Sequence, residues 1–332
     1  MKPSTANAGA VQSTPSEHAV VALETLGAKI KQNPEGEAVA VDLSDKQQVT
    51  DADLVHLKGL TNLRILYLGG TQITDAGLVH LKNLAWLKTL HLPTQITDAG
   101  LVHLKNLGNL QYLDLPTQIT DAGLGHLKGL TNLQKLYLYR TQITDTGLVH
   151  LKGMIKLERL SLGFTKVTDA GLVHLKGLNK LGFLTLSNLS RVTDAGLAHL
   201  KGMANLSFLG LRGTSITGEG LVHLNGMVSL QELGLEKNQV TDAGLVNLKE
   251  MTQLVTLGLT ETQVSDEGLA HLKEMPSLEM LFLSGTKVTD AGLVHLKQMT
   301  NMQVLAVTDT KVTDEGVAEL SKALPKCSVL NH

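Results

Sequence analysis

Ten histidines recur at one position of a repeating sequence block, so transition-metal binding is the first chemistry to consider. In the arrangement derived below they lie on neighbouring helices, which pack about 8–10 Å apart. Two ligands of one zinc ion lie only about 3–4 Å apart, given bonds near 2.0–2.1 Å. We therefore predict no metal site and no cofactor, and expect neutral, partly buried rings that wedge between helices and hydrogen-bond a backbone group. The ten are His56, His80, His103, His126, His150, His174, His199, His223, His271 and His295, with Asn247 in the gap.

An aspartate also recurs once per block, and a row of carboxylates suggests calcium. The spacing lacks the dense ligand loop of a calcium site. Each aspartate follows a threonine at a predicted helix start, where the hydroxyl would accept from a first-turn amide and the carboxylate would face the positive end of the helix dipole. We therefore predict a capping role. The row comprises Asp51, Asp75, Asp98, Asp121, Asp145, Asp169, Asp194, Asp242, Asp266, Asp290 and Asp314.

General acid–base catalysis would suit one pair, His91 and Asp114, which are expected to be adjacent outward residues one coil apart. No nucleophile or cleft accompanies them. The chain also lacks G-x-x-x-x-G-K-[ST], H-E-x-x-H, G-x-S-x-G and Cys-x-x-Cys. We therefore predict that the protein is not an enzyme and has no catalytic residues.

The elements that position these residues follow from a Thr-Asp-Ala-Gly-Leu block that returns about every 24 residues. A fixed period of this size indicates a solenoid, in which each unit buries its apolar face against its neighbours. In residues 63–86, Leu66 and Leu68 alternate as in a half-buried strand, and Leu78, Leu81 and Leu84 share one helix stripe. Each repeat is therefore predicted to be strand, turn, helix, turn. The blocks start at Thr50, Thr74, Thr97, Thr120, Thr144, Thr168, Thr193, Thr217, Thr241, Ser265, Thr289 and Thr313.

A short polar residue three positions before each cap is expected to hydrogen-bond backbone amides of its own or the adjacent turn. Thr71 is the first member of this row, and Asn238 replaces threonine in a later repeat. We interpret the row as structural.

The pattern L-x-x-L-x-L-x-x-T-x-[IV]-T-D-x-G-L-x-x-L resembles a leucine-rich repeat. It is closest to the bacterial TDAGL type and is similar to the cysteine-containing repeats of F-box and ribonuclease-inhibitor-like proteins, although threonine or asparagine replaces their cysteine. The resemblance implies an α/β fold: a right-handed arc or horseshoe with parallel β-strands on the concave face and helices on the convex face. It also implies a binding function, because family members mostly bind proteins and occasionally other ligands.

Four segments are expected along the chain. Residues 1–15 read as a flexible leader, and residues 16–49 as an N-terminal cap in which an amphipathic helix over 16–31 precedes a first strand at 37–43. Residues 50–315 hold about eleven repeats of 23–25 residues, and residues 316–332 form a C-terminal cap. Capping units cover the terminal hydrophobic faces that a solenoid would otherwise expose.

The residues between the inward leucines are predicted to face the concave side. All four tyrosines and four phenylalanines fall there or in the adjacent turns, and none occupies a repeating leucine position. Exposed aromatic rings with interleaved charges are typical of binding surfaces, although strands also favour aromatic residues for stability alone. The predicted binding residues are Tyr67, His91, Tyr112, Asp114, Lys135, Tyr137, Tyr139, Arg140, Arg159, Phe164, Phe183 and Phe208.

These residues favour a protein–protein interaction scaffold whose partner binds the concave aromatic face. A carbohydrate or small-ligand receptor using the same tyrosines, and a structural spacer, stay open as alternatives. A net charge of −2 without a basic stripe argues against nucleic acid. No apolar run reaches 18 residues, so we expect no transmembrane helix. The compartment stays open between the cytoplasm and export after removal of a signal segment.

Overall fold

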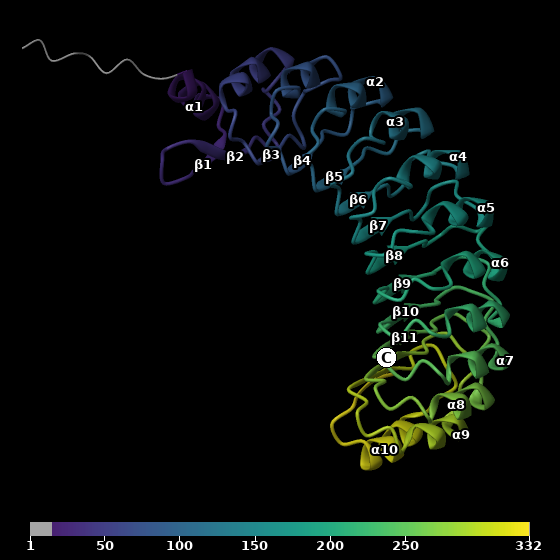
Figure 1. The fold of residues 1–332 in the computed structure, drawn as a ribbon. Helices are drawn as coiled ribbons and strands as arrows, with labels where there is room; N and C mark the ends of the chain where they lie inside the picture. The colour runs from purple at the N-terminus through teal and green to yellow at the C-terminus, as the bar shows by residue number, and fades with distance from the viewer. Residues whose placement is uncertain (1–14, 332) are drawn as a thin grey trace, which may run out of the picture.

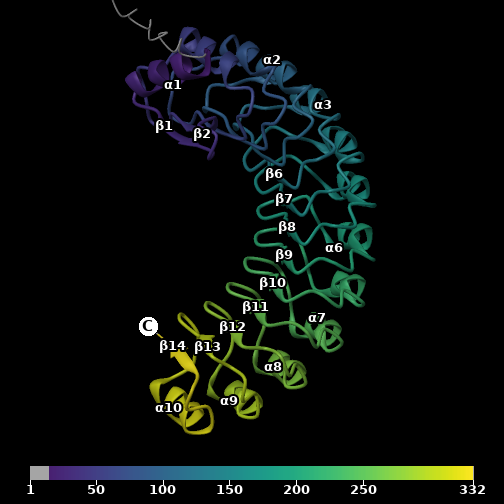
Figure 2. The same cartoon turned by 60° about the vertical axis from the view of Figure 1, so that its left-hand side comes forward.

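The protein is a curved solenoid with strands along its inner side and helices along its outer side (Figures 1 and 2). The computed structural model describes residues 15–331, so the predicted leader lies outside the described residues except for Pro15. Within this range the sheet has 14 strands that follow one another in chain order. The β1–β2 pair is antiparallel and every later pair is parallel. None of the helices in this range is long and apolar enough to cross a bilayer.

The strands are short, and those of the repeats each contain three residues. The strands are β1 (Lys29–Gln32), β2 (Ala38–Asp42), β3 (Ile65–Tyr67), β4 (Thr89–His91), β5 (Tyr112–Asp114), β6 (Lys135–Tyr137), β7 (Arg159–Ser161), β8 (Phe183–Thr185), β9 (Phe208–Gly210), β10 (Glu232–Gly234), β11 (Thr256–Gly258), β12 (Met280–Phe282), β13 (Val304–Ala306) and β14 (Ser328–Leu330). The central leucines of consecutive strands pair in register, as Leu66 does with Leu90. This register keeps the residues on either side of each central leucine on the concave face.

The outer side is built from single α-turns that run into 3₁₀ turns. The α-helices are α1 (Pro15–Thr25), α2 (Asp98–Leu101), α3 (Asp121–His126), α4 (Asp145–Leu148), α5 (Asp169–Leu172), α6 (Asp194–Leu197), α7 (Asp242–Leu245), α8 (Asp266–Leu272), α9 (Asp290–Leu293) and α10 (Asp314–Ala323). The 3₁₀ helices are η1 (Asp51–Gly59), η2 (Gly77–Leu81), η3 (Val102–Leu104), η4 (Val149–Leu151), η5 (Val173–Leu175), η6 (Ala198–Leu200), η7 (Glu219–Leu224), η8 (Val246–Leu248) and η9 (Val294–Leu296). The predicted helical side is confirmed, and in most repeats it includes a 3₁₀ turn. Leucines spaced three apart match the three-residue turn of a 3₁₀ helix better than the α-helical turn.

The core is one continuous aliphatic column made almost entirely of leucine. Leu66, Leu90 and Leu113 on the strands are fully buried, as are Leu81 and Leu104 on the helical side. Fully burying one such side chain contributes roughly 1.5–3 kcal/mol. Because neighbouring coils share this column, each coil depends on the next for its stability.

The N-terminal cap differs from the predicted long helix. Helix α1 ends at Thr25, and Lys29–Gln32 forms strand β1, which pairs antiparallel with β2. Gly27 has φ +87°, a left-handed conformation that ends the helix and that glycine adopts without steric cost. The expected strand at 37–43 corresponds to β2.

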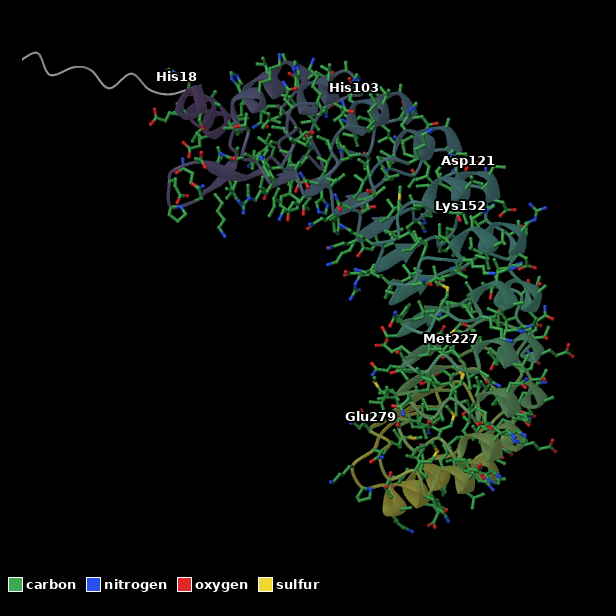
Figure 3. The ribbon with its side chains drawn as sticks, viewed as in Figure 1. His18, His103, Asp121, Lys152, Met227 and Glu279 are labelled. Atoms are coloured by element: carbon green, nitrogen blue, oxygen red, sulfur yellow. The ribbon has the colours of Figure 1, made fainter. Side chains whose placement is uncertain are left out.

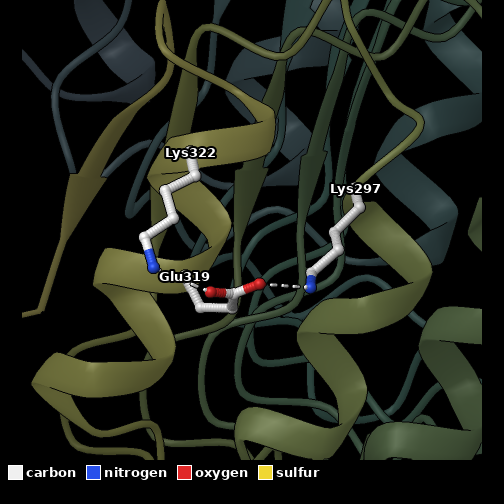
Figure 4. A network of polar contacts seen from close by, with 3 residues as sticks. All are labelled: Lys297, Glu319 and Lys322. Carbon is white, nitrogen blue, oxygen red and sulfur yellow. Dashed lines mark hydrogen bonds and ion pairs between the residues drawn. The ribbon is translucent and has the colours of Figure 1, made fainter.

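The C-terminal cap is the longer helix α10 followed by β14. Glu319 on α10 joins Lys297 of the preceding coil and Lys322 of its own helix, each at 3.1 Å (Figure 4). These contacts hold the pKa of Glu319 below its ordinary value. Since all three groups are exposed, the ion pairs add little to stability, and the buried Leu320 anchors the helix instead.

The recurring aspartate bridges two coils, a role that its predicted dipole interaction does not include. Asp145 Oδ1 accepts from the backbone N–H of Thr168, and its Oδ2 accepts from the Thr168 hydroxyl, each at 2.7 Å. The Thr168 hydroxyl in turn accepts from Ala170 N–H at 3.3 Å, so the predicted threonine cap is confirmed there. Where the aspartate is present, a coil is thus hydrogen-bonded to the next through a charged acceptor.

The glycine of the block follows from the same contact. A Cβ atom added to Gly171 would lie 2.3 Å from Asp145 Oδ1, closer than real contacts allow. One repeat departs from the pattern, because Gly218 stands where the aspartate belongs and adopts φ +109°. Instead of the aspartate bridge, this repeat has a close approach of Gly218 to Gly244 and a hydrogen bond from Asn247 Nδ2 to the Gly218 carbonyl.

Most hydroxyls of the short polar row donate to carbonyls, and the predicted amide contacts are made by Asn238 and Thr310. The Thr71 hydroxyl donates to the Leu68 carbonyl three residues earlier at 2.7 Å. Asn238 does more, because its Oδ1 accepts from Ile216 N–H at 3.0 Å while its Nδ2 donates to the Leu211 carbonyl at 2.7 Å. The threonine hydroxyl adds a second hydrogen bond to a carbonyl that already accepts from the threonine N–H, whereas the asparagine amide also reaches the preceding coil.

Candidate binding surface on the concave face

Three-residue strands carry nine of the twelve predicted residues onto the concave face. The first and third residues of each strand point away from the buried leucine between them, as in Lys135-Leu136-Tyr137. Tyr139, Arg140 and Phe164 follow strands β6 and β7 in the adjoining turns. In Figure 3, Glu279 marks this inner side, whereas His103, Asp121 and Lys152 lie on the outer side.

Four rings form a continuous stack across strands β3 to β6. The centroids of Tyr67 and His91 are 4.7 Å apart, those of His91 and Tyr112 also 4.7 Å, and those of Tyr112 and Tyr137 5.4 Å. The ring planes meet at angles between 28° and 43°, so His91 and Tyr112 are stacked and the other two pairs are tilted. Tyr112 and Tyr137 therefore contact each other across neighbouring strands. We call these four residues the first ring stack.

A second ring stack follows on strands β8 and β9. Phe183 and Phe208 lie 4.2 Å apart and nearly parallel, at 10°. The guanidinium of Arg159 lies 5.2 Å from the Phe183 ring centroid, within cation–π range. Arg159, on β7, therefore places a positive charge between the Phe183–Phe208 pair and the first ring stack.

A third group lies in the turns at the rim of the face. Tyr139 and Phe164 meet edge to face at 5.3 Å, and the Arg140 guanidinium lies 5.3 Å from one ring and 5.2 Å from the other. Arg140 and Phe164 have φ of +59° and +58°, a conformation that is costly for bulky side chains. Both rings remain more than 40 % exposed, at 44 % and 43 %. Because the same turn position also has a positive φ in other coils, as at Lys237 and Glu261, this conformation belongs to the repeat, and what distinguishes the rim cluster is its exposed apolar surface.

Partial burial shifts the ionisable groups of the first ring stack. Desolvation lowers the pKa of His91, against the opposing charges of Asp114 and Asp42. Desolvation also raises the pKa of Tyr112, with Asp114 adding to the effect, and raises the pKa of Asp114 itself. His91 is therefore neutral at pH 7. It forms no ion pair with Asp114 in the described residues.

The positive charges of the face are available to a ligand. Within residues 15–331, Lys135, Arg140 and Arg159 form no ion pair with an acidic side chain. The same residues contain no group of three or more histidine, cysteine or acidic side chains able to hold a metal ion. The surface therefore offers aromatic rings together with cations that form no ion pair in the described residues.

The outer histidines only partly follow their prediction. His80 is partly buried, and desolvation lowers its pKa, with Lys58 adding to the effect and Asp51 opposing it. However, Nδ1 of His80 and of His174 is buried without a hydrogen-bond partner. The predicted backbone contact is therefore not made by that nitrogen.

Comparisons with known proteins agree with this architecture. Residues 59–81 and 298–321 match the family model for the leucine-rich repeat. No curated protein matches the chain. A crystal structure of an internalin, InlF, from Listeria monocytogenes superposes with a TM-score of 0.70 at 23 % identity, covering 95 % of this chain and 94 % of that one.

Two larger proteins share the fold over part of their length. The ectodomain of the receptor kinase GASSHO1/SCHENGEN3 from Arabidopsis thaliana, solved with CASPARIAN STRIP INTEGRITY FACTOR 2, has a TM-score of 0.57 at 20 % identity. It covers 91 % of this chain but only 39 % of its own. TLR13, solved with ssRNA13, has a TM-score of 0.52 at 18 % identity, with 83 % and 37 % covered. At these identities the likeness concerns the fold.

The repeat pattern, the parallel sheet and the two family-model matches support a leucine-rich repeat fold for this chain. Proteins with this fold are commonly ligand- or protein-binding modules. The TDAGL subclass stays a prediction.

Proposed function

We propose that this protein binds a segment of another protein along its concave face, through the two ring stacks and the rim cluster. The observation that carries the proposal is the separation of aromatic and aliphatic residues. The buried column is aliphatic, whereas rings on consecutive strands contact one another on the surface. Rings needed only for packing would be expected inside the column.

The rigidity of the scaffold supports the same function. Each ring stands on a strand whose central leucine is fully buried, and neighbouring rings already fix one another by stacking. Ordered aromatic side chains lose little conformational entropy on binding. Tyrosine and arginine are also the residue types enriched at interaction hot spots. We expect Tyr112, Tyr137, Tyr139, Arg159 and Phe183 to dominate the binding energy.

The stacking disfavours the carbohydrate alternative. Sugar rings pack against exposed aromatic faces, but the faces of Tyr112 are covered by His91 on one side and Tyr137 on the other. The edges and the tyrosine hydroxyl remain for the ligand, which suits polar and apolar groups of a polypeptide.

Selection from a displayed peptide library tests this function. Peptides enriched on the wild-type protein should lose binding to a Tyr112→Ala/Tyr137→Ala variant and keep it on Trp86→Ala. Trp86 is the matched control because it is an aromatic residue, 57 % exposed, in a turn outside the ring stacks. A glycan array and single-stranded RNA serve as counter-probes. The proposal fails if peptides selected on the wild type bind the double variant equally well, or if only glycans or RNA bind.

A further inference from the structure

A hollow of about 320 Å³ lies on the concave face beyond the second ring stack. It is lined by residues of strands β9 to β12 and of the turns that follow β8, β9 and β10. Apart from Phe208, none of its lining residues belongs to the predicted binding set. Its size falls at the lower end of ligand pockets, enough for one side chain of a partner.

The hollow is open because the strand residues that form its floor carry no side chains of their own. The third strand residue, which is Tyr67 or Tyr137 in the first ring stack, is glycine in three consecutive strands: Gly210, Gly234 and Gly258. The row continues with Phe282, which pairs with Gly258. The Phe282 ring therefore forms a wall about one strand spacing, roughly 4.8 Å, from the glycine floor.

A carboxylate occupies this floor. Glu236 Oε1 would lie 2.2 Å from a Cβ atom on Gly258, and Oε2 3.0 Å from one on Gly234, so the carboxylate covers both glycines. Within the described residues no donor or cation pairs with it. Lys237, its neighbour in sequence, is directed to Glu261 at 3.2 Å. Arg212 lines the hollow without forming an ion pair with Glu236.

The charge of the hollow favours a cationic ligand. Two carboxylates, Glu232 and Glu236, line it against the single guanidinium of Arg212. The ligand group that best suits a carboxylate next to an aromatic ring is positively charged, planar and able to donate two parallel hydrogen bonds. Guanidinium meets all three conditions, because it pairs bidentately with carboxylates and stacks on aromatic rings.

We propose that this hollow binds an arginine side chain of a protein segment docked on the concave face. The guanidinium pairs with the Glu236 carboxylate and stacks on Phe282, while the aliphatic stem crosses the glycine floor toward Phe208. This inference rests on the proposed function, because the arginine would belong to the bound protein segment. The subsite itself can be tested without a partner.

The direct test uses N-acetylarginine N-methylamide as a probe of the whole protein. With 15N-glycine labelling, the amide signals of Gly210, Gly234 and Gly258 report from the floor itself. We expect these signals to shift with arginine and not with the citrulline analogue, which has the same shape without the charge. Equal shifts with citrulline, larger shifts with the glutamate analogue, or no shift of these glycines would each overturn the proposal.

Two variants identify the groups involved. Glu236→Gln should lower the affinity for the arginine probe about tenfold. Phe282→Leu should lower it about two- to fivefold, as expected for an exposed cation–π contact. Glu219→Gln is the matched control, since it removes the same charge from an exposed residue of η7 on the outer side. Equal weakening by Glu236→Gln and Glu219→Gln would show that only net charge matters, which contradicts the subsite.

Binding of the arginine probe should not depend on the first ring stack. The Tyr112→Ala/Tyr137→Ala variant should bind the arginine probe like the wild type, because neither tyrosine lines the hollow. Loss of selected peptides in that variant with no arginine binding to the wild type would refute this inference and leave the proposed function standing. Suppose instead that the wild type binds the arginine probe and that the selected peptides bind the Tyr112→Ala/Tyr137→Ala variant as well as the wild type. This result would support the subsite and refute the proposed function.

Discussion

Replacing Asp121 with alanine should break the hydrogen bonding between two coils and lower the free energy of unfolding by about 2–4 kcal/mol. The carboxylate accepts from Thr144 N–H at 2.8 Å and from the hydroxyls of Thr144 and Thr146. A hydrogen bond to a charged group contributes about 1.5–3 kcal/mol. Partial solvent exposure reduces this sum. Asp121→Asn retains an acceptor without the charge, so its cost should be nearer 1 kcal/mol.

Urea unfolding followed by circular dichroism measures the loss, and hydrogen exchange of the Thr144 amide localises it. Because repeat arrays do not always unfold in one step, the amide is the sharper observable. Alanine should accelerate its exchange while a distant coil keeps wild-type protection. A wild-type unfolding midpoint together with unchanged exchange at Thr144 would refute the interlock.

Acid supplies an independent check on the same carboxylate. Burial acts to raise the pKa of Asp121, but the hydrogen bonds from Thr144 and Thr146 outweigh it, so the pKa lies below its ordinary value. A lowered pKa in the folded state stabilises the protein above the unfolded pKa of about 3.9. This contribution is lost as the pH falls through the folded pKa. The stability difference between wild type and Asp121→Ala should therefore shrink below about pH 4, and a constant difference would contradict the assignment.

Gly147 reports on the same contact from the other side. A Cβ atom there would lie 2.2 Å from Asp121 Oδ1, so Gly147→Ala should destabilise the wild type much more than it destabilises Asp121→Ala. Gly129→Ala is the control, because its Cβ would meet nothing closer than 4.0 Å. Additive effects of the first two substitutions would exclude direct contact.

Three further outcomes follow from the structure. Gly218→Asp restores the sequence motif but should destabilise the protein in urea, because φ +109° and the approach of Gly244 oppose any side chain; a gain in stability would be contrary to this geometry. His80→Gln should reduce the loss of melting temperature on acidification, since a lowered histidine pKa destabilises the fold as the pH falls below the unfolded value of about 6.5; identical pH profiles would exclude a role for burial of the neutral ring. A double-mutant cycle of Phe183→Ala and Phe208→Ala should give a coupling of about 0.5–1.5 kcal/mol in unfolding measurements, whereas zero coupling would mean that the rings do not stack in solution.

The periodic sequence is sufficient to predict the solenoid, because every leucine of the pattern has one place in a column shared by neighbouring coils. It also places Tyr112 and Tyr137 on one face, since the two-residue alternation of a strand decides which side chains point outward. Short helices were harder to predict. Leucines three residues apart suit both helix types, and only the packing of each turn selects the 3₁₀ form.

The contacts between coils could not be predicted by considering one repeat at a time. The aspartate was interpreted within its own helix, whereas its partners lie in the next repeat, about 23 residues further along, as Asp145 and Thr168 illustrate. Strand β1 was missed because Lys29–Gln32 lacks a two-residue hydrophobic alternation and depends on pairing with β2. The hollow at Glu236 had a visible signal, glycine in three successive strands, but its depth depends on where Phe208 and Phe282 lie.

The most direct test of the central claim is the dissociation constant of one selected peptide for three proteins, measured by calorimetry. If the concave rings form the interface, Tyr112→Ala/Tyr137→Ala should weaken the complex at least thirtyfold, roughly the loss of one hot spot, while Trp86→Ala stays near wild type. Melting temperatures establish that all three proteins are folded. Equal affinities for the wild type and the double variant, or a larger loss with Trp86→Ala, would place the binding surface elsewhere on the molecule.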